Sequence, residues 1–202
     1  MKGVILLNGD PYEGEIDCKG AYVICCDGAY DWAKGRVRID ENTGDYDSLG
    51  YIPVPPPTQI FPSEKNFTDG EIAMKKLIAM GADEVIIYGG GGGREDHFLG
   101  NLHLLYLAFI NNVRAIMRNN GSFLFLGAGK IDLSGNAGKT FSLLPFGGAV
   151  HIKYSEGCKY AYPESIGYGE CRGISNIAVR GDASVTVGDG DCALIIVNEG
   201  KV

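Results

Sequence analysis

The run "YGGGGGREDHFLGNL" at residues 88–102 places five consecutive glycines between an apolar segment and a charged one. Glycine loses more backbone entropy on folding than any other residue, so this density indicates a backbone conformation or a close approach that side chains would forbid. The residues on either side predict a strand before the glycines and a helix after them. We therefore expect something to lie close to the backbone of this loop.

The first half of the chain alternates strand and helix patterns. The short apolar runs "GVILL", "AYVICC" and "EVIIYGG" end in polar or glycine turns, as buried strands do. Before the third run, Thr68 and Glu71 form a capping box for a helix, whose expected apolar stripe is Ile72, Ala73, Lys76, Leu77 and Met80. A second helix is expected from about residue 96 to 111, followed by the strand "VRAIMR". This order predicts an α/β domain with a largely parallel, Rossmann-like sheet over residues 1–124.

The second half has a different pattern. The Asn-Gly pair in "RNNGSF" is typical of a hairpin, and the β-like runs that follow are short and separated by Gly, Asp and Asn. These runs are "FLFLG", "TFSLLPF", "AVHIKY", "NIAVR", "ASVTVG" and "CALIIV". Residues 125–202 are therefore predicted to form an all-β sandwich domain.

Composition narrows the classes of function. A formal net charge of −7, with 18 scattered basic residues, argues against a general nucleic-acid or membrane-surface binder. The N-terminal apolar run is too short for a signal peptide, and "LHLLYLAFI" is too short to span a membrane. The six cysteines contain no CxxC pair, which favours reduced thiols. We expect a cytoplasmic protein that binds neither nucleic acid nor membranes.

Acidic residues follow the predicted strands. Ligands of open α/β sheets bind outside the carboxyl ends of the strands, and those ends carry Asp27, "GDYDS" at 44–48 and the glycine run. Asp45 and Asp47, two residues apart, suit one hard cation such as Mg²⁺ bridging phosphate oxygens. Asp69, in the first turn of the capped helix, offers a third oxygen. Turn formation and a favourable helix-dipole interaction would also account for these acids.

The glycine run suits an anion, because free backbone N–H groups and the positive end of the following helix point to one place. It is not a Walker loop, since Glu95 and Asp96 stand where Lys and Ser or Thr would be needed, and Arg94 replaces the last glycine of GxGxxG. Arg94 is suited to clamping a phosphate, with a surface ion pair as the alternative. Asp96 as an N-cap and His97 as an ordinary polar residue are the simpler interpretations of those two positions.

Four segments in this order, "CDGAYDWA", "GDYDS", "EKNFTDGEIAM" and "GGGGGREDHFLGNL", resemble the catalytic-domain motifs of thiamine pyrophosphokinases. The later "GCKYAY" and "GISN" resemble the substrate-domain signatures of that family, so the resemblance extends from about Asp27 to Asn176. The chain departs from the family pattern in "RIDENT" at 38–43, where an apolar strand is usual, and in Asn66, where an acid is common.

The resemblance implies an α/β domain that binds ATP and Mg²⁺, a β-sandwich domain that binds thiamine, and a homodimer with thiamine sites between subunits. It implies transfer of pyrophosphate from ATP to the thiamine hydroxyl, giving thiamine diphosphate and AMP. The implied Mg²⁺ ligands are Asp45, Asp47 and Asp69. The residues implied around ATP and the transferred group are Asp27, Ser48, Thr68, Gly91, Gly92, Gly93, Arg94, Asp96 and His97. Thiamine is expected to contact Tyr160, by stacking, and Ser175 and Asn176, by hydrogen bonds.

Such a transfer depends mainly on positioning and on neutralising charge, which Mg²⁺ and Arg94 would do. A carboxylate or His97 would take the hydroxyl proton, and the sequence does not choose between them. Two other functions use the same residues. A metal-dependent phosphohydrolase would use water in place of thiamine, and a nucleotide or thiamine sensor would bind without turnover.

Overall fold

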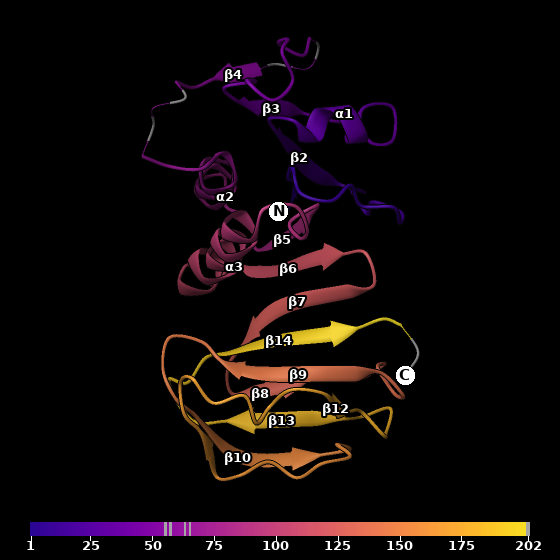
Figure 1. The fold of residues 1–202 in the computed structure, drawn as a ribbon, viewed down its shortest axis with the longest axis vertical. Helices are drawn as coiled ribbons and strands as arrows, with labels where there is room; N and C mark the ends of the chain where they lie inside the picture. Colours follow the sequence, from indigo (N-terminus) through magenta and orange to yellow (C-terminus); the bar gives the residue numbers. More distant parts are fainter. Residues whose placement is uncertain (55, 57, 63, 65, 201–202) are drawn as a thin grey trace. The chain divides into compact units, whose positions relative to one another are not determined.

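The fold comes from a computed structural model that describes residues 1–200 apart from 55, 57, 63 and 65. The chain divides into two compact units, Met1–Asn120 and Gly121–Val202, each drawn in its own colour range in Figure 1. The predicted domain boundary after residue 124 falls inside a strand, Ser122–Gly127.

The helices are α1 (Ala29–Ala33), α2 (Asp69–Ala79) and α3 (Glu95–Ile110). The strands of the first unit are β1 (Lys2–Leu6), β2 (Ala21–Cys26), β3 (Glu41–Gly44), β4 (Thr58–Ile60), β5 (Glu84–Tyr88) and β6 (Arg114–Asn119). Those of the second unit are β7 (Ser122–Gly127), β8 (Lys130–Asp132), β9 (Thr140–Pro145), β10 (Val150–Glu156), β11 (Ser165–Ile166), β12 (Asn176–Ile177), β13 (Ser184–Val187) and β14 (Ala193–Asn198).

The predicted fold class, a Rossmann-like α/β domain plus a β-sandwich, is wrong. The chain is mostly β: among the described residues, ten strands form one mixed sheet in the order β12-β9-β14-β7-β6-β5-β1-β2-β3-β4, and four form a second sheet. The three helices contain only 5, 11 and 16 residues. Hydrophobic periodicity identifies a strand but not its hydrogen-bonding neighbour, so it could not show that strands from both halves of the sequence belong to one sheet.

The first unit aligns the carboxyl ends of its central strands. The pairs β1·β2, β1·β5 and β2·β3 are all parallel. In register, Leu6 lies beside Cys25 and Tyr88, and Cys26 lies beside Thr43. The segments that leave β1, β2, β3 and β5 therefore emerge at one edge of the sheet. Apolar side chains of β1, β2 and β5, such as Val4, Val23 and Ile86, pack with α1 in a buried cluster.

Helix α2 begins as the capping box predicts, because Thr68 Oγ1 accepts a hydrogen bond from the Glu71 backbone N–H at 3.2 Å. Ala73 and Leu77 of the predicted stripe are buried. The predicted stripe is wrong at one position, because Met80 is exposed and Met74 is buried instead. Lys76 is partly exposed, and its Nζ pairs with the buried Glu41 of β3.

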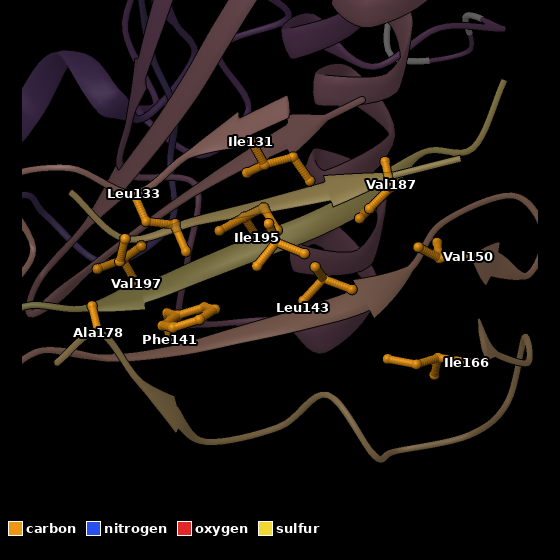
Figure 2. Close-up of a cluster of buried hydrophobic side chains, with 13 residues drawn as sticks. Ile131, Leu133, Phe141, Leu143, Val150, Ile166, Ala178, Val187, Ile195 and Val197 are labelled. Carbon is orange, nitrogen blue, oxygen red and sulfur yellow. The ribbon is translucent and has the colours of Figure 1, made fainter. Parts of the chain in front are cut away.

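The second unit has its core between strands of the two sheets (Figure 2). Phe141 and Leu143 of β9 and Ile195 of β14 are each at most 1% exposed, and they pack with residues of the four-stranded sheet such as Val185 and Val187. Each predicted β-like run after residue 122 contains a strand of the structure. Short apolar runs bounded by turn residues were therefore the local signal that identified these strands.

Candidate functional site

A cavity of about 810 Å³ lies at the edge where the strands of the first unit end. The sequence-predicted residues among its lining are Asp27, Asp45, Asp47, Ser48, Thr68, Asp69, Gly92, Gly93, Arg94, Asp96 and His97. Gly91 is the predicted residue of this unit outside that lining, and it contributes to a neighbouring cavity of about 220 Å³. The parallel register explains this convergence, because the segments after β2, β3 and β5 leave the sheet at one edge.

The carboxylates of Asp27, Asp45 and Asp47 lie close enough to share a cation, with one oxygen of each within 4.8 Å of the others. Among the described residues, this group contains Asp27 rather than the expected Asp69, which lines the same cavity from the start of α2. Mg²⁺ takes oxygen ligands at about 2.0–2.1 Å in octahedral geometry, so adjacent ligands are about 2.9 Å apart and opposite ligands about 4.2 Å apart. The oxygen donors therefore suit Mg²⁺, and the carboxylates would move closer together to bind it.

The backbone conformations of Tyr46 and Asp27 help to place these carboxylates at the cavity. Tyr46, between Asp45 and Asp47, is 3% exposed and has a φ of +60°, so its ring is buried while its two neighbours line the cavity. Asp27 also has a positive φ, +45°, a conformation rarely adopted by residues other than glycine. Ser48 Oγ donates a short hydrogen bond to Asp27 Oδ2 and accepts one from Asn8 Nδ2 at 3.4 Å. Two strained residues held in place in this way are typical of a functional site.

The glycine run packs against the segment that leaves β1. The backbone N–H groups of Gly9 and Asp10 donate to the carbonyls of Gly89 and Gly91 at 2.9 and 2.8 Å. A Cβ on Gly92 would lie 1.9 Å from Asp10 Oδ2, whereas one on Gly93 would meet nothing within 4 Å. Much of the glycine density therefore serves close packing within the protein, and Gly92 and Gly93 are the part of the run that faces the cavity.

Arg94 and Asp96 form an exposed bidentate ion pair at the start of α3. Arg94 Nε and Nη2 donate to the two oxygens of Asp96 at 3.1 and 2.6 Å. The hydrogen bond from Arg94 holds the pKa of the Asp96 carboxyl below its usual value. Asp96 also accepts from the His97 backbone N–H at 3.0 Å, while the N-cap position belongs to Arg94, whose side chain makes no capping bond. Arg94 must leave Asp96 at least in part to clamp a phosphate.

Several cavity residues were missed by the sequence analysis. Asn8 and Gly9 follow β1, whose end joins the same sheet edge, so the rule that ligands bind at strand ends applies to them too. Asn101 also lines the cavity, four residues after His97 on α3, and donates from Nδ2 to the Gly90 carbonyl at 2.9 Å. Residues four apart share a helix face, which was the available signal.

The predicted thiamine contacts lie in the second unit. Tyr160 is 54% exposed, with Lys159 Nζ 5.3 Å from the centre of its ring. Asn176 is buried, and its amide accepts from the Tyr160 backbone N–H at 3.0 Å and donates to the Tyr160 carbonyl at 2.8 Å. The side chain of Asn176 is thus already engaged in holding Tyr160. Ser175 is exposed, has a φ of +62°, and its N–H donates to Ser142 Oγ at 3.1 Å.

The turn that carries Ser175 depends on a glycine. A Cβ on Gly173 would lie 1.8 Å from the Leu143 carbonyl oxygen, so no side chain fits between this turn and β9. The "GISN" segment therefore combines one packing requirement, at Gly173, with two exposed side chains, at Ile174 and Ser175.

The geometry of the first unit defines a class of protein: a parallel sheet edge with three clustered carboxylates, a glycine loop and an arginine, suited to a metal-bound phosphate ligand. Residues 18–117 match the family model described as thiamin pyrophosphokinase, catalytic domain. Thiamine pyrophosphokinase of Bacillus subtilis (strain 168) is 32% identical over 129 residues, a match that covers 59% of this chain and 60% of that protein's length.

Solved structures share the fold. The crystal structure of thiamine pyrophosphokinase from Bacillus subtilis has a TM-score of 0.83 at 21% identity, with both chains covered completely. A thiamin pyrophosphokinase family protein from Enterococcus faecalis has a TM-score of 0.81 at 18% identity, again over both whole chains. The enzyme from Candida albicans has a TM-score of 0.72 at 16% identity, over 97% of this chain and 89% of that one. Residues 18–117 thus match the catalytic domain of the thiamine pyrophosphokinase family, which confirms the resemblance found in the motifs.

Among the described residues, no helix is both long enough and apolar enough to cross a membrane. All six cysteines are free thiols.

Proposed function

We propose that this protein transfers the pyrophosphoryl group of ATP to the hydroxyl of thiamine, giving thiamine diphosphate and AMP. The observation that carries the proposal is that one cavity is lined by the three clustered carboxylates, by Asp69, by the glycine loop and by the Arg94–Asp96 pair. In the transfer, the thiamine oxygen bonds to the β-phosphorus, the bond from that phosphorus to the α,β-bridging oxygen breaks, and AMP leaves. The hydroxyl proton passes to a carboxylate or to His97.

In this proposal Asp27, Asp45 and Asp47 hold Mg²⁺, and Asp69 completes the acidic wall of the cavity. Bound Mg²⁺ neutralises charge on the phosphate oxygens. Ser48 holds Asp27 in the orientation that faces the other two carboxylates. Gly92 and Gly93 let the phosphates approach the backbone, and Thr68 contacts them from the start of α2.

In this proposal, Arg94 changes its partner when ATP binds. Its guanidinium is paired with Asp96 in the absence of a phosphate and turns toward the triphosphate when ATP binds. Asp96, with its lowered pKa, stays ionised at neutral pH and keeps Arg94 near the cavity.

For thiamine, we propose that Tyr160 stacks on the aminopyrimidine ring and that Ser175 and Asn176 provide polar contacts. Tyr160 is exposed, and its backbone N–H and carbonyl are both hydrogen-bonded to the Asn176 side chain. These two features support a role for its ring as a fixed stacking surface. We also propose a cytoplasmic homodimer, as the family resemblance implies, and light scattering coupled to size-exclusion chromatography tests the dimer.

Product analysis tests the reaction. The purified protein is incubated with ATP, Mg²⁺ and thiamine, and AMP, ADP, phosphate and thiamine diphosphate are resolved by chromatography. Equal amounts of AMP and thiamine diphosphate are expected. Phosphate or ADP without a thiamine product would replace the proposal with hydrolase chemistry, and binding without turnover would replace it with a sensor. The variants Asp27→Asn and Asp69→Asn, compared for Mg²⁺ affinity, test which acid is the third metal ligand.

A further inference from the structure

An ion pair between the buried Glu41 and the partly exposed Lys76 connects β3 to α2. Glu41 is 4% exposed, on a strand in which all four residues are buried. Its Oε2 lies 2.5 Å from Lys76 Nζ and accepts a hydrogen bond from the Tyr22 hydroxyl at 3.0 Å. Its Oε1 is also buried and accepts no hydrogen bond from a residue that the structure describes. The Lys76 side chain is 30% exposed, so only the Glu41 charge is buried. Burying that charge costs free energy that an apolar residue on β3 would not cost, so stability alone does not account for this pair.

The two charges lie on the elements that carry the acids of the cavity. Glu41 is on β3, four residues before Asp45, which follows directly on the end of that strand. Lys76 is seven residues after Asp69, the first residue of α2, so the two share a face about two turns apart. The pair therefore joins the strand that leads to Asp45 with the helix that begins at Asp69.

The register of the sheet also places Glu41 near the cavity. Cys26 lines the cavity at the end of β2 and lies beside Thr43 of β3, while Glu41 lies beside Ile24. Glu41 is therefore two residues before Thr43 on the strand that adjoins the cavity-lining Cys26.

We infer that the Glu41–Lys76 pair positions the metal site, by holding α2 against β3 so that Asp69 and Asp45 face each other across the cavity at a set distance. The inference rests on the proposed binding of a divalent cation there. The neighbouring Lys75 provides the contrast, because it pairs with Glu71 within its own helix at 2.8 Å and does not tie that helix to the sheet.

The test uses the full chain and Mn²⁺ alone, measured by electron paramagnetic resonance without ATP or thiamine. The double variant Glu41→Gln/Lys76→Met removes both charges without leaving one unpaired, and Gln keeps an acceptor for Tyr22. We expect its Mn²⁺ dissociation constant to rise about tenfold or more, the range found when outer partners of metal ligands are removed. Lys75→Met is the matched control and should bind Mn²⁺ as the wild type does.

A second variant, Glu41→Asp, keeps the charge but withdraws the carboxylate by one methylene, and it should raise the dissociation constant by a smaller factor. Both variants are measured well below their thermal unfolding midpoints. Wild-type Mn²⁺ affinity in either folded variant would overturn the inference, leaving the pair as a packing element. Product analysis of the wild type tests the proposed reaction separately. If the variants lose Mn²⁺ affinity but the wild type makes no thiamine diphosphate, the proposed reaction is overturned and the role of the ion pair stands.

Discussion

Gly9 lies so close to the glycine run that one added methyl group, in Gly9→Ala, should have a large effect on stability and activity. In Gly9→Ala, the new Cβ would lie 2.4 Å from the Gly91 carbonyl oxygen and 2.5 Å from that of Gly89. These distances are about 1 Å shorter than the 3.4 Å at which ordinary contacts begin. Both obstacles are backbone atoms, so no change of rotamer relieves them, and the glycine run must move.

The free energy of unfolding should fall by about 2–4 kcal/mol. Overpacking of a well-packed site costs about 1–3 kcal/mol. Movement of the run also weakens the bonds from the Gly9 and Asp10 N–H groups, at about 0.5–1.5 kcal/mol for each bond lost. For a chain of this size, the midpoint of thermal unfolding should fall by roughly 5–15 °C. Displacement of the loop by about 1 Å should lower kcat/KM for ATP by as much as about a hundredfold.

Scanning calorimetry measures the midpoint, and steady-state kinetics with varied ATP measures kcat/KM. Gly100→Ala is the control for the calorimetry alone, because its added Cβ meets no atom within 4 Å in the middle of α3, whereas Gly100 itself lines the cavity. It should raise the free energy of unfolding by about 0.5–1 kcal/mol, as alanine does relative to glycine in a helix. A Gly9→Ala protein with the wild-type midpoint and unchanged kinetics would refute the view that close packing accounts for glycine here.

Three further predictions concern the metal, the thiamine contact and pH. Asp45→Asn or Asp47→Asn should raise the Mg²⁺ concentration for half-maximal velocity at least about tenfold, and an unchanged Mg²⁺ titration would exclude these residues as ligands. Tyr160→Ala should raise KM for thiamine about tenfold, equivalent to about 1.4 kcal/mol, without changing KM for ATP; equal damage to both would indicate a structural role. Burial, and then the bond to Glu41, raises the pKa of Tyr22 to about 12. The unfolded state therefore loses this proton first, near pH 10, so stability should fall as pH rises from 10 toward 12; in Tyr22→Phe, denaturant titrations should show a smaller fall.

Local patterns predicted the features that depend on local geometry. The Thr68 N-cap of α2 and the start of α3 near residue 96 follow from residues a few positions apart, and both are present in the structure. The β-like runs after residue 122 were recognised because an apolar face and turn residues leave a signal within each run.

Strand β3 had no such signal. Its residues Glu41, Asn42 and Thr43 are polar, yet each is at most 4% exposed. Burial of Glu41 is possible because Lys76 and Tyr22, which are distant in the sequence, supply a charge and a hydrogen bond. A hydropathy pattern cannot report such compensation, so the strand was missed.

By itself, the sequence indicated the family, through motifs that keep their order and spacing, and it named most of the residues that line the cavity. The tertiary structure alone decided that strands from both halves form one mixed sheet, that Asp27 joins Asp45 and Asp47, and that Lys76 pairs with Glu41. The physical reason is that motifs record which side chains the chemistry needs. Strand pairing and the meeting of charges depend on hydrogen bonds and burial between segments that are far apart in the chain.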